Sequence, residues 1–358
     1  MDAETVVRLA HECGFELAGI APAAPLDEYE YYRVWVEAGM AGQMRYLTDH
    51  RAALRADPRC LLPEARSVIC VGMLYNTPMP ASTAMSDPSR GWISRYAWGE
   101  DYHALVRAAL RRLLVRLREH TRSGFAARIA VDAAPLLERA LARRAGLGWI
   151  GRNTCLINQW HGSWFFLGEL LVSLEIDPGS PPAELCGSCM RCVEACPTGA
   201  LVPTGLRRGP AWALDARRCT SYLTFELRGP IPEPLRPALG GHVFGCDICQ
   251  EVCPWNRKAP VTAEQAFQPR HYAPALAELA SLDAADFAER FARSPVRRAG
   301  HAGLLRNVAV ALGNSGLPAH RAALERLAVA GDPMVAEHAH WGLARLSAAG
   351  GYNERGWE

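Results

Sequence analysis

The segments CGSCMRCVEACP, from Cys186 to Pro197, and GCDICQEVCPWN, from Gly245 to Asn256, decide how this chain is interpreted. Each segment spaces its cysteines two or three residues apart and contains a Cys-Pro pair. The chain of 358 residues has 12 cysteines, and eight of them fall between Cys186 and Cys253. In a chain without a recognisable secretion signal, such clustering indicates metal or redox chemistry rather than disulfides.

The first segment has the cysteine spacing of bacterial ferredoxins, in which three thiolates bind one iron–sulfur cube and the fourth binds a second cube. The second segment lacks the first cysteine of that pattern, because Val243 stands at its position. Cys219 is the only other thiol between the two segments, so we predict that it supplies the missing ligand. The predicted 4Fe–4S ligands are Cys186, Cys189, Cys192 and Cys253 for one cluster, and Cys196, Cys219, Cys246 and Cys249 for the other.

A pair of structural zinc sites is the alternative interpretation of the cysteines. Zinc modules usually place two short cysteine pairs on either side of a longer loop. Three cysteines in a row with two-residue gaps fit that pattern poorly, so we favour iron–sulfur clusters. The four cysteines outside the cluster region lie in apolar or helical settings and are expected to be packed thiols; they are Cys13, Cys60, Cys70 and Cys155.

The overall composition is that of a soluble globular protein. There are 39 basic and 37 acidic side chains, a formal charge of +2, and 49% of the residues are hydrophobic. No stretch approaches the roughly 20 apolar residues of a membrane helix, and the N-terminus has no basic signal-peptide region. We therefore expect a cytoplasmic protein without membrane contact, and a monomer by default.

The chain divides into three predicted domains with a mixed α+β fold. Residues 1–178 alternate helical and strand patterns and form the expected α/β domain. Helices are predicted at 2–13, 25–40 and 101–121, strands at 15–21, 67–75, 125–131 and 168–176, and a glycine-rich turn at 146–154. Residues 179–260 form the ferredoxin-like domain. Residues 261–358 form a helical domain, in which helices at 304–314, 318–330 and 333–348 are predicted to make a short HEAT-like module.

Two neighbouring clusters carry electrons but perform no chemistry on a substrate, so another group must accept the electrons. The α/β half contains no G-x-G-x-x-G motif after a strand and no G-x-x-x-x-G-K-[ST] motif. Neither a nicotinamide site of the Rossmann type nor a P-loop is therefore supported.

Several long motifs resemble those of epoxyqueuosine reductases. They are VDAAPLLERALARRAGLGWIGRNTCLI (Val131–Ile157), GSWFFLGELL (Gly162–Leu171), RCTSYLTFELRG (Arg218–Gly229) and the two cysteine segments. The resemblance extends over essentially the whole chain and implies reduction of the epoxide of epoxyqueuosine to queuosine at the tRNA wobble position. It also implies a base-off cobalamin, without a histidine bound to cobalt, recharged through two 4Fe–4S clusters.

The sequence alone does not indicate cobalamin. Asp101-Tyr-His103 begins like the corrinoid motif D-x-H-x-x-G, but Val106 replaces its glycine, and we attribute the fragment to chance. A corrinoid dehalogenase-like reductase acting on a small molecule is the alternative function. A simple electron carrier would leave the α/β half without a purpose.

Asp132 matches the proposed proton donor of the family. A carboxyl group buried at a strand end can have a raised pKa, and we expect Asp132 to be neutral near pH 7 for this reason. From the residues alone, the N-cap of a helix beginning near Pro135 is the favoured role of Asp132, and it is compatible with proton donation; the family resemblance reverses that preference. We interpret Glu138, three residues further on, as a structural carboxylate at the helix start.

The resemblance also nominates cobalamin contacts. These are Arg55, Tyr96, Asp132, Arg152, Asn153, Thr154, Asn158, Ser163, Ser221 and Asp247. The expected partners are a tRNA anticodon stem-loop and a low-potential electron donor such as ferredoxin or flavodoxin. The arginines expected to form basic patches for tRNA phosphates are Arg207, Arg208, Arg217, Arg218, Arg228, Arg293, Arg297, Arg298 and Arg306.

Overall fold

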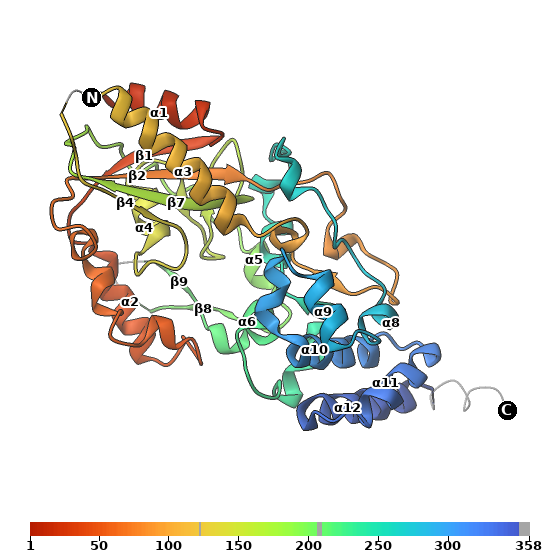
Figure 1. Ribbon diagram of the computed structural model, residues 1–358. Helices are drawn as coiled ribbons and strands as arrows, with labels where there is room; N and C mark the ends of the chain where they lie inside the picture. The colour runs from red at the N-terminus through yellow and green to blue at the C-terminus, as the bar shows by residue number, and fades with distance from the viewer. Residues whose placement is uncertain (122, 206–209, 351–358) are drawn as a thin grey trace.

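A four-stranded sheet organises the N-terminal half of the protein (Figure 1). The computed structural model describes residues 1–121, 123–205 and 210–350. The strand order is β1 (Leu17–Pro22), β2 (Ser67–Leu74), β7 (Phe165–Val172) and β4 (Ala127–Ala130). Every neighbouring pair in this sheet runs antiparallel. The predicted mixed fold class is confirmed, and β7 begins three residues before the predicted strand.

Helices cover both faces of this sheet. Helices α1 (Ala3–Glu12) and α3 (Tyr102–Glu119) pack on one face with Ile69 and Val71 of β2 (Figure 1). Helix α4 (Glu138–Arg144) packs on the opposite face, where Val68 and Cys70 of β2 and Leu171 of β7 are buried. All eight residues of β2 are buried, as expected for a strand covered on both sides.

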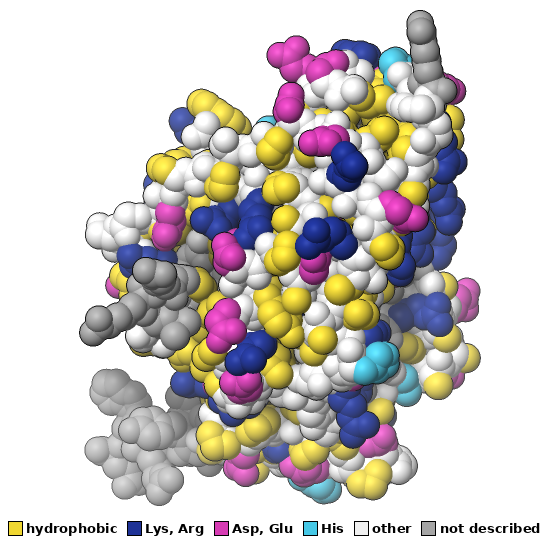
Figure 2. Space-filling model, turned by 90° about the vertical axis from the view of Figure 1, so that its left-hand side faces the viewer, with side chains coloured by type: hydrophobic (Ala, Val, Ile, Leu, Met, Phe, Trp, Pro, Cys, Tyr) yellow, Lys and Arg dark blue, Asp and Glu magenta, His cyan; other side chains and the backbone are white. Residues whose placement is uncertain are grey.

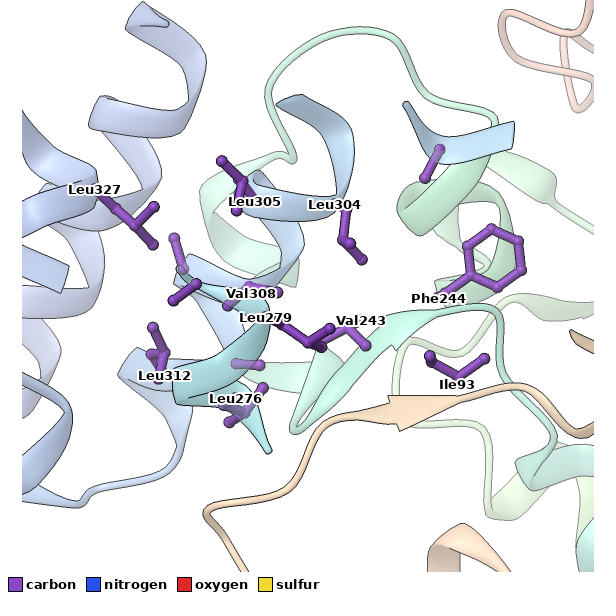
Figure 3. Packing of buried hydrophobic residues seen from close by; sticks show 14 of the residues in the cluster. Ile93, Val243, Phe244, Leu276, Leu279, Leu304, Leu305, Val308, Leu312 and Leu327 are labelled. Atoms are coloured by element: carbon purple, nitrogen blue, oxygen red, sulfur yellow. The ribbon is translucent and has the colours of Figure 1, made fainter. Parts of the chain in front are cut away.

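A second hydrophobic core joins segments that are far apart in the sequence. Strand β3 (Trp92–Ile93) pairs in parallel with β10 (His242–Phe244), and α10 (His301–Asn314) packs against both. Figure 3 shows Ile93 close to Val243 and Phe244, with Leu304 and Val308 of α10 beside them. Part of the predicted α/β segment is therefore built into the core of the C-terminal half.

The remaining elements are short. They are α2 (Glu28–Glu37), β5 (Trp149–Ile150), β6 (Leu156–Ile157), α5 (Arg191–Glu194), β8 (Leu201–Pro203), β9 (Trp212–Leu214), α6 (Thr220–Phe225), α7 (Ile248–Glu251), α8 (Leu276–Leu279) and α9 (Ala284–Arg290). The chain described ends in α11 (Arg321–Ala328) and α12 (Pro333–Gly350), so the three helices predicted for the tail are confirmed. Within the three described ranges, no helix combines the length and apolar character needed to cross a bilayer.

The surface carries both signs of charge. Figure 2 shows one face on which basic and acidic side chains are interspersed with hydrophobic ones, while basic side chains form a column along the right-hand edge of the view. The small net charge of +2 therefore conceals a local concentration of positive charge.

Candidate functional site

Three side chains form a hydrogen-bonded row at one end of the sheet. Asp132 follows β4 and has a φ of 53°, a left-handed conformation that Asp adopts more readily than most residues. The Asp132 carboxylate oxygen Oδ2 lies 3.1 Å from Nε2 of His103. The other ring nitrogen of His103, Nδ1, lies 2.6 Å from Oδ1 of Asp101. Asp101 also caps α3 by accepting the backbone N–H of His103, which fixes the position of the imidazole.

The two carboxylates of this row favour the protonated form of the His103 imidazole. The hydrogen bonds to Asp101 and then to Asp132 raise the pKa of His103 from 6.5 to about 9. Burial works to raise the pKa of Asp132, but the hydrogen bond and the charge of His103 outweigh it, so the Asp132 pKa is lowered. Near neutral pH the site is therefore an imidazolium ion held between two carboxylates.

This arrangement corrects two expectations about Asp132. We expected a neutral carboxyl with a raised pKa, whereas the Asp132 pKa is lowered, because the hydrogen bond and charge of His103, 3.1 Å away, outweigh desolvation. Asp132 is also not an N-cap, since α4 begins only at Glu138 and its N-cap position is Leu137. The backbone N–H of Asp132 instead donates to Oε1 of Glu138 at 2.7 Å.

Aromatic and charged side chains surround this row. The Tyr102 ring stacks on Phe166 with centroids 4.1 Å apart and on His103 at 4.2 Å. The Tyr96 ring contacts Tyr102, Phe225 and Phe244. Arg298, which forms an ion pair with Glu226 at 2.5 Å, is close enough for its charge to act on the Asp132 pKa. The tail of the chain thus reaches the same site as the sheet.

The structure brings the predicted cluster ligands together in two groups. Burial and then the neighbouring thiols Cys253, Cys186 and Cys189 raise the pKa of Cys192 to about 11. Burial, together with Cys219 and Cys196, raises the pKa of Cys246.

Cys249 belongs to the second group, since Cys246 and Cys219 both act on its pKa. Two sets of four thiols suit two iron–sulfur cubes, each of which takes four cysteine ligands. These neighbours agree with the partition that the spacing predicts, and the assignment of each thiol to a cluster stays a prediction.

The other four cysteines differ in their surroundings. Cys13 and Cys70 are buried, as expected for packed thiols. Cys60 is exposed, so the expectation was wrong for this residue, which ends a short helical turn on the surface. Cys155 lies beside Cys249, with its thiol within hydrogen-bond reach, and is therefore a neighbour of the second group.

Six of the predicted cobalamin contacts are engaged with the protein itself. Their side chains are hydrogen bonded to backbone or side-chain groups of the chain: Arg55, Arg152, Asn153, Asn158, Ser163 and Asp247. Asp247, for example, accepts from Ser94 Oγ and from the Arg95 N–H, and burial raises its pKa to about 6. In this structure these residues shape the site rather than offer free donors.

Two of the other predicted contacts are more open. Within the described part of the chain, no hydrogen-bond partner meets the hydroxyl group of Tyr96 or of Ser221. Thr154 is held at φ 61°, and Arg139 donates to its carbonyl oxygen and, at 3.4 Å, to its hydroxyl oxygen. The Tyr96 ring packs against Phe225 and Phe244. Free hydroxyl groups such as those of Tyr96 and Ser221 can donate to the amide substituents of a corrin, so this donor set fits that group.

The predicted basic patches are partly corrected. Arg306 is 1% exposed and donates to the carbonyl groups of Leu223, Leu227 and Gly229, so it cannot contact a phosphate. Arg217 and Arg293 are exposed and form ion pairs with Asp215 and Glu100. Arg218, Arg228 and Arg297 are exposed or at the surface, whereas Arg207 and Arg208 lie outside the described residues.

The sequence alone predicts no role for His103, because its D-x-H fragment is attributed to chance. The residue stands in a D-x-H fragment at the start of a strongly amphipathic helix, and an Asp at that position is a common N-cap. A histidine two residues after such a cap projects from the first helical turn. The fold then brings it to Asp132, which is 29 residues away in the sequence.

A histidine held between two carboxylates and two groups of cysteines in one chain indicate the class of protein: an iron–sulfur oxidoreductase. Residues 185–256 match the family described as "4Fe-4S double cluster binding domain", and residues 55–133 match "Epoxyqueuosine reductase QueG, DUF1730". The epoxyqueuosine reductase of Pseudomonas aeruginosa is 44% identical over 96% of this chain and 94% of its own length. The chain belongs to the epoxyqueuosine reductase family.

Solved structures of the family have the same fold. A crystal structure of an epoxyqueuosine reductase with an epoxyqueuosine-modified tRNA-Tyr stem loop superposes with a TM-score of 0.84 and 28% identity, over 96% of this chain and 89% of that one. The Bacillus subtilis enzyme, in a state with its catalytic aspartate loop swung out of the active site, gives a TM-score of 0.84 at 27% identity, over 96% and 90% of the two chains.

Proposed function

We propose that this protein reduces the epoxide of epoxyqueuosine to queuosine at the wobble position of tRNA. The observation that carries the proposal is the His103–Asp132 pair, which holds a proton at the end of the sheet in a chain whose cysteines form two groups of four. The related structure with a bound epoxyqueuosine-modified stem loop supports the same substrate.

The proposed cofactors are a base-off cobalamin and two 4Fe–4S clusters. When bound, cobalamin supplies a low-valent cobalt that is a strong reductant and nucleophile. The residues proposed to hold it are Tyr96, Asp132, Thr154 and Ser221. The six predicted contacts that are hydrogen bonded within the chain are proposed to keep the surrounding segments in place. The clusters are ligated by the two groups of thiols and deliver one electron at a time.

The residues of the site supply the proton. Removing the epoxide oxygen takes two electrons and two protons, and the oxygen leaves as water. His103 holds a proton at Nε2, and Asp132 lies between this nitrogen and solvent, with its side chain 42% exposed. We infer that one proton passes from His103 through Asp132 to the departing oxygen and that the second comes from solvent, while Asp101 keeps the imidazole in place.

The domain organisation is part of the proposal. Residues 1–178 bind the cobalamin, residues 179–260 hold the clusters, and residues 261–358 form a HEAT-like module that contacts tRNA. We further propose a monomeric, cytoplasmic enzyme that receives electrons from a ferredoxin or flavodoxin.

The test is an anaerobic assay with purified protein. Protein loaded with iron, sulfide and cobalamin is incubated with epoxyqueuosine-containing tRNA and a low-potential reductant, and nucleosides are analysed by mass spectrometry. Queuosine is expected from the wild type, whereas Asp132→Ala should lose about 10²-fold or more in rate. Full activity of Asp132→Ala would remove the assignment of this residue, and no queuosine from the wild type would refute the function.

A further inference from the structure

A buried carboxyl group without a donor lies beneath the proposed acid. Glu169 is 0% exposed, on the face of β7 that α4 covers. Its strand neighbours are Cys70 on β2 and Ala130 on β4, two residues before Asp132. Among the described residues, no group donates a hydrogen bond to either oxygen of Glu169. An ionised carboxylate in such a place would cost several kcal/mol.

The carboxyl group of Glu138 lies within hydrogen-bond reach of Glu169 and raises its pKa. Glu138 stands in the first turn of α4, where its Oε1 accepts the backbone N–H of Asp132 at 2.7 Å. Two carboxylates cannot be hydrogen bonded to each other without a proton between them. A single proton on Glu169 satisfies the contact, because Glu138 then accepts both from Glu169 and from Asp132.

The surrounding charges agree with this assignment. Burial raises the pKa of Glu169 well above 4.5, and burial with the charge of Asp132 raises the pKa of Glu138 to about 7. Glu138 is thus the first of the pair to ionise, and Glu169 keeps its proton. The ionisable groups that face the pair from the neighbouring elements are Asp132, Arg139, Cys70 and Tyr102.

Asp132 needs the hydrogen bond to Glu138 to keep its backbone conformation. Asp132 has a positive φ, a conformation that is unfavourable for a non-glycine residue unless the surroundings fix it. The catalytic aspartate loop of the Bacillus subtilis relative has been observed outside the active site. A loop with two positions requires contacts that select the inward one.

We propose that protonated Glu169 donates a hydrogen bond to Glu138, and that Glu138 in turn accepts the Asp132 N–H and fixes the proposed acid in its inward position. Both glutamates are positioning residues. This inference rests on the proposed role of Asp132, but two of its three tests do not require turnover.

Infrared spectroscopy detects the proton directly. In D₂O near pH 8, the wild type is expected to show the C=O stretch of a protonated carboxyl group, and Glu169→Gln should lose it. Glu175→Gln is the matched control, because Glu175 is 81% exposed and pairs with Arg66 on the surface. If the wild type and Glu169→Gln gave the same band, or if neither gave one, the proton would not be on Glu169.

Hydrogen exchange measures how strongly the hydrogen bond to Glu138 protects the Asp132 amide. In the peptide containing the Asp132 amide, Glu138→Ala should exchange about tenfold faster or more, the effect of losing one charge-assisted hydrogen bond. Glu138→Gln keeps an acceptor oxygen and should stay within about twofold of the wild type. Equal protection in Glu138→Ala and the wild type would overturn the proposal, and the folded Glu138→Gln variant excludes general unfolding as the cause.

Turnover provides the third test. Misplacing the acid should lower kcat of Glu138→Ala by about tenfold, with KM for the tRNA stem loop within about twofold. A rise in KM at unchanged kcat would instead assign Glu138 to substrate binding. If no variant or wild-type protein formed queuosine, the proposed function would fail, while the infrared and exchange results would still decide the proton and the contact.

Discussion

Replacing Asp101 with asparagine tests whether His103 carries the reactive proton. Asp101 makes the contact that does most to raise the pKa of His103 to about 9. Asparagine keeps an oxygen that can cap α3 and accept from the ring, but it removes the negative charge. A single nearby charge moves a pKa by about 1 to 3 units, so the alkaline midpoint of kcat should move down by at least about 1 pH unit.

The size of the effect follows from the position of the wild-type midpoint. With that midpoint near pH 9, about three quarters of the wild-type enzyme still carries the proton at pH 8.5. A variant with a midpoint about 1.5 units lower would retain roughly a tenth of its active form at that pH. At pH 6.5 the two enzymes should agree within about twofold.

The assay is single-turnover formation of queuosine from stem-loop RNA between pH 6 and 9.5, with excess loaded enzyme. His103→Gln accompanies the series and should lose about 10²-fold or more across the range. Superimposable pH profiles for the wild type and Asp101→Asn would refute the reasoning, as would full activity of His103→Gln. In either case the raised pKa of His103 would have no part in the reaction.

Three further predictions concern the clusters, the tail and RNA binding. Cys219→Ser should reduce iron from about eight to about four atoms per chain, measured by metal analysis, whereas exposed Cys60→Ser should not. Arg306→Met leaves three buried carbonyl groups without their donor and should lower the free energy of unfolding by about 3–5 kcal/mol in denaturant titrations; a loss below about 1 kcal/mol would contradict the contacts. Binding of the stem loop should weaken steeply with salt, and a flat response would exclude phosphate contacts.

The helices were predictable from their hydrophobic period, and the central strand β2 of the main sheet was predictable from its continuous apolar run. The run SVICVGML predicts a strand covered on both faces, and β2 is such a strand. Strand β3 was not predictable, because Trp92 and Ile93 lie in a loop-like stretch rich in Pro, Ser and Gly. Their partner, β10, lies about 150 residues later, and no local pattern encodes a pairing at that distance.

The cluster ligands were predictable because they lie close together in the sequence. The geometry of an iron–sulfur cube dictates their spacing, so the motif alone identifies the ligands. The hydrogen-bonded row of Asp101, His103 and Asp132 was not predictable from the sequence. Asp132 and His103 come from different elements, and the pKa of each depends on the other. Glu169 gave a signal that was overlooked: a single carboxylate within the otherwise apolar strand FFLGELLV.

The pairing of β3 with β10 also has a consequence for biosynthesis. Trp92 and Trp98 are among the largest fully buried side chains. They are covered by β10 and α10, whose core residues lie between residues 242 and 312. At a translation rate of about 5–20 residues per second, roughly 11–43 seconds pass between the synthesis of Trp98 and that of residue 312, the last of these covering residues. Both tryptophans are therefore exposed to chaperones during that interval, and the nascent chain cannot complete its second core until almost the whole message has been read.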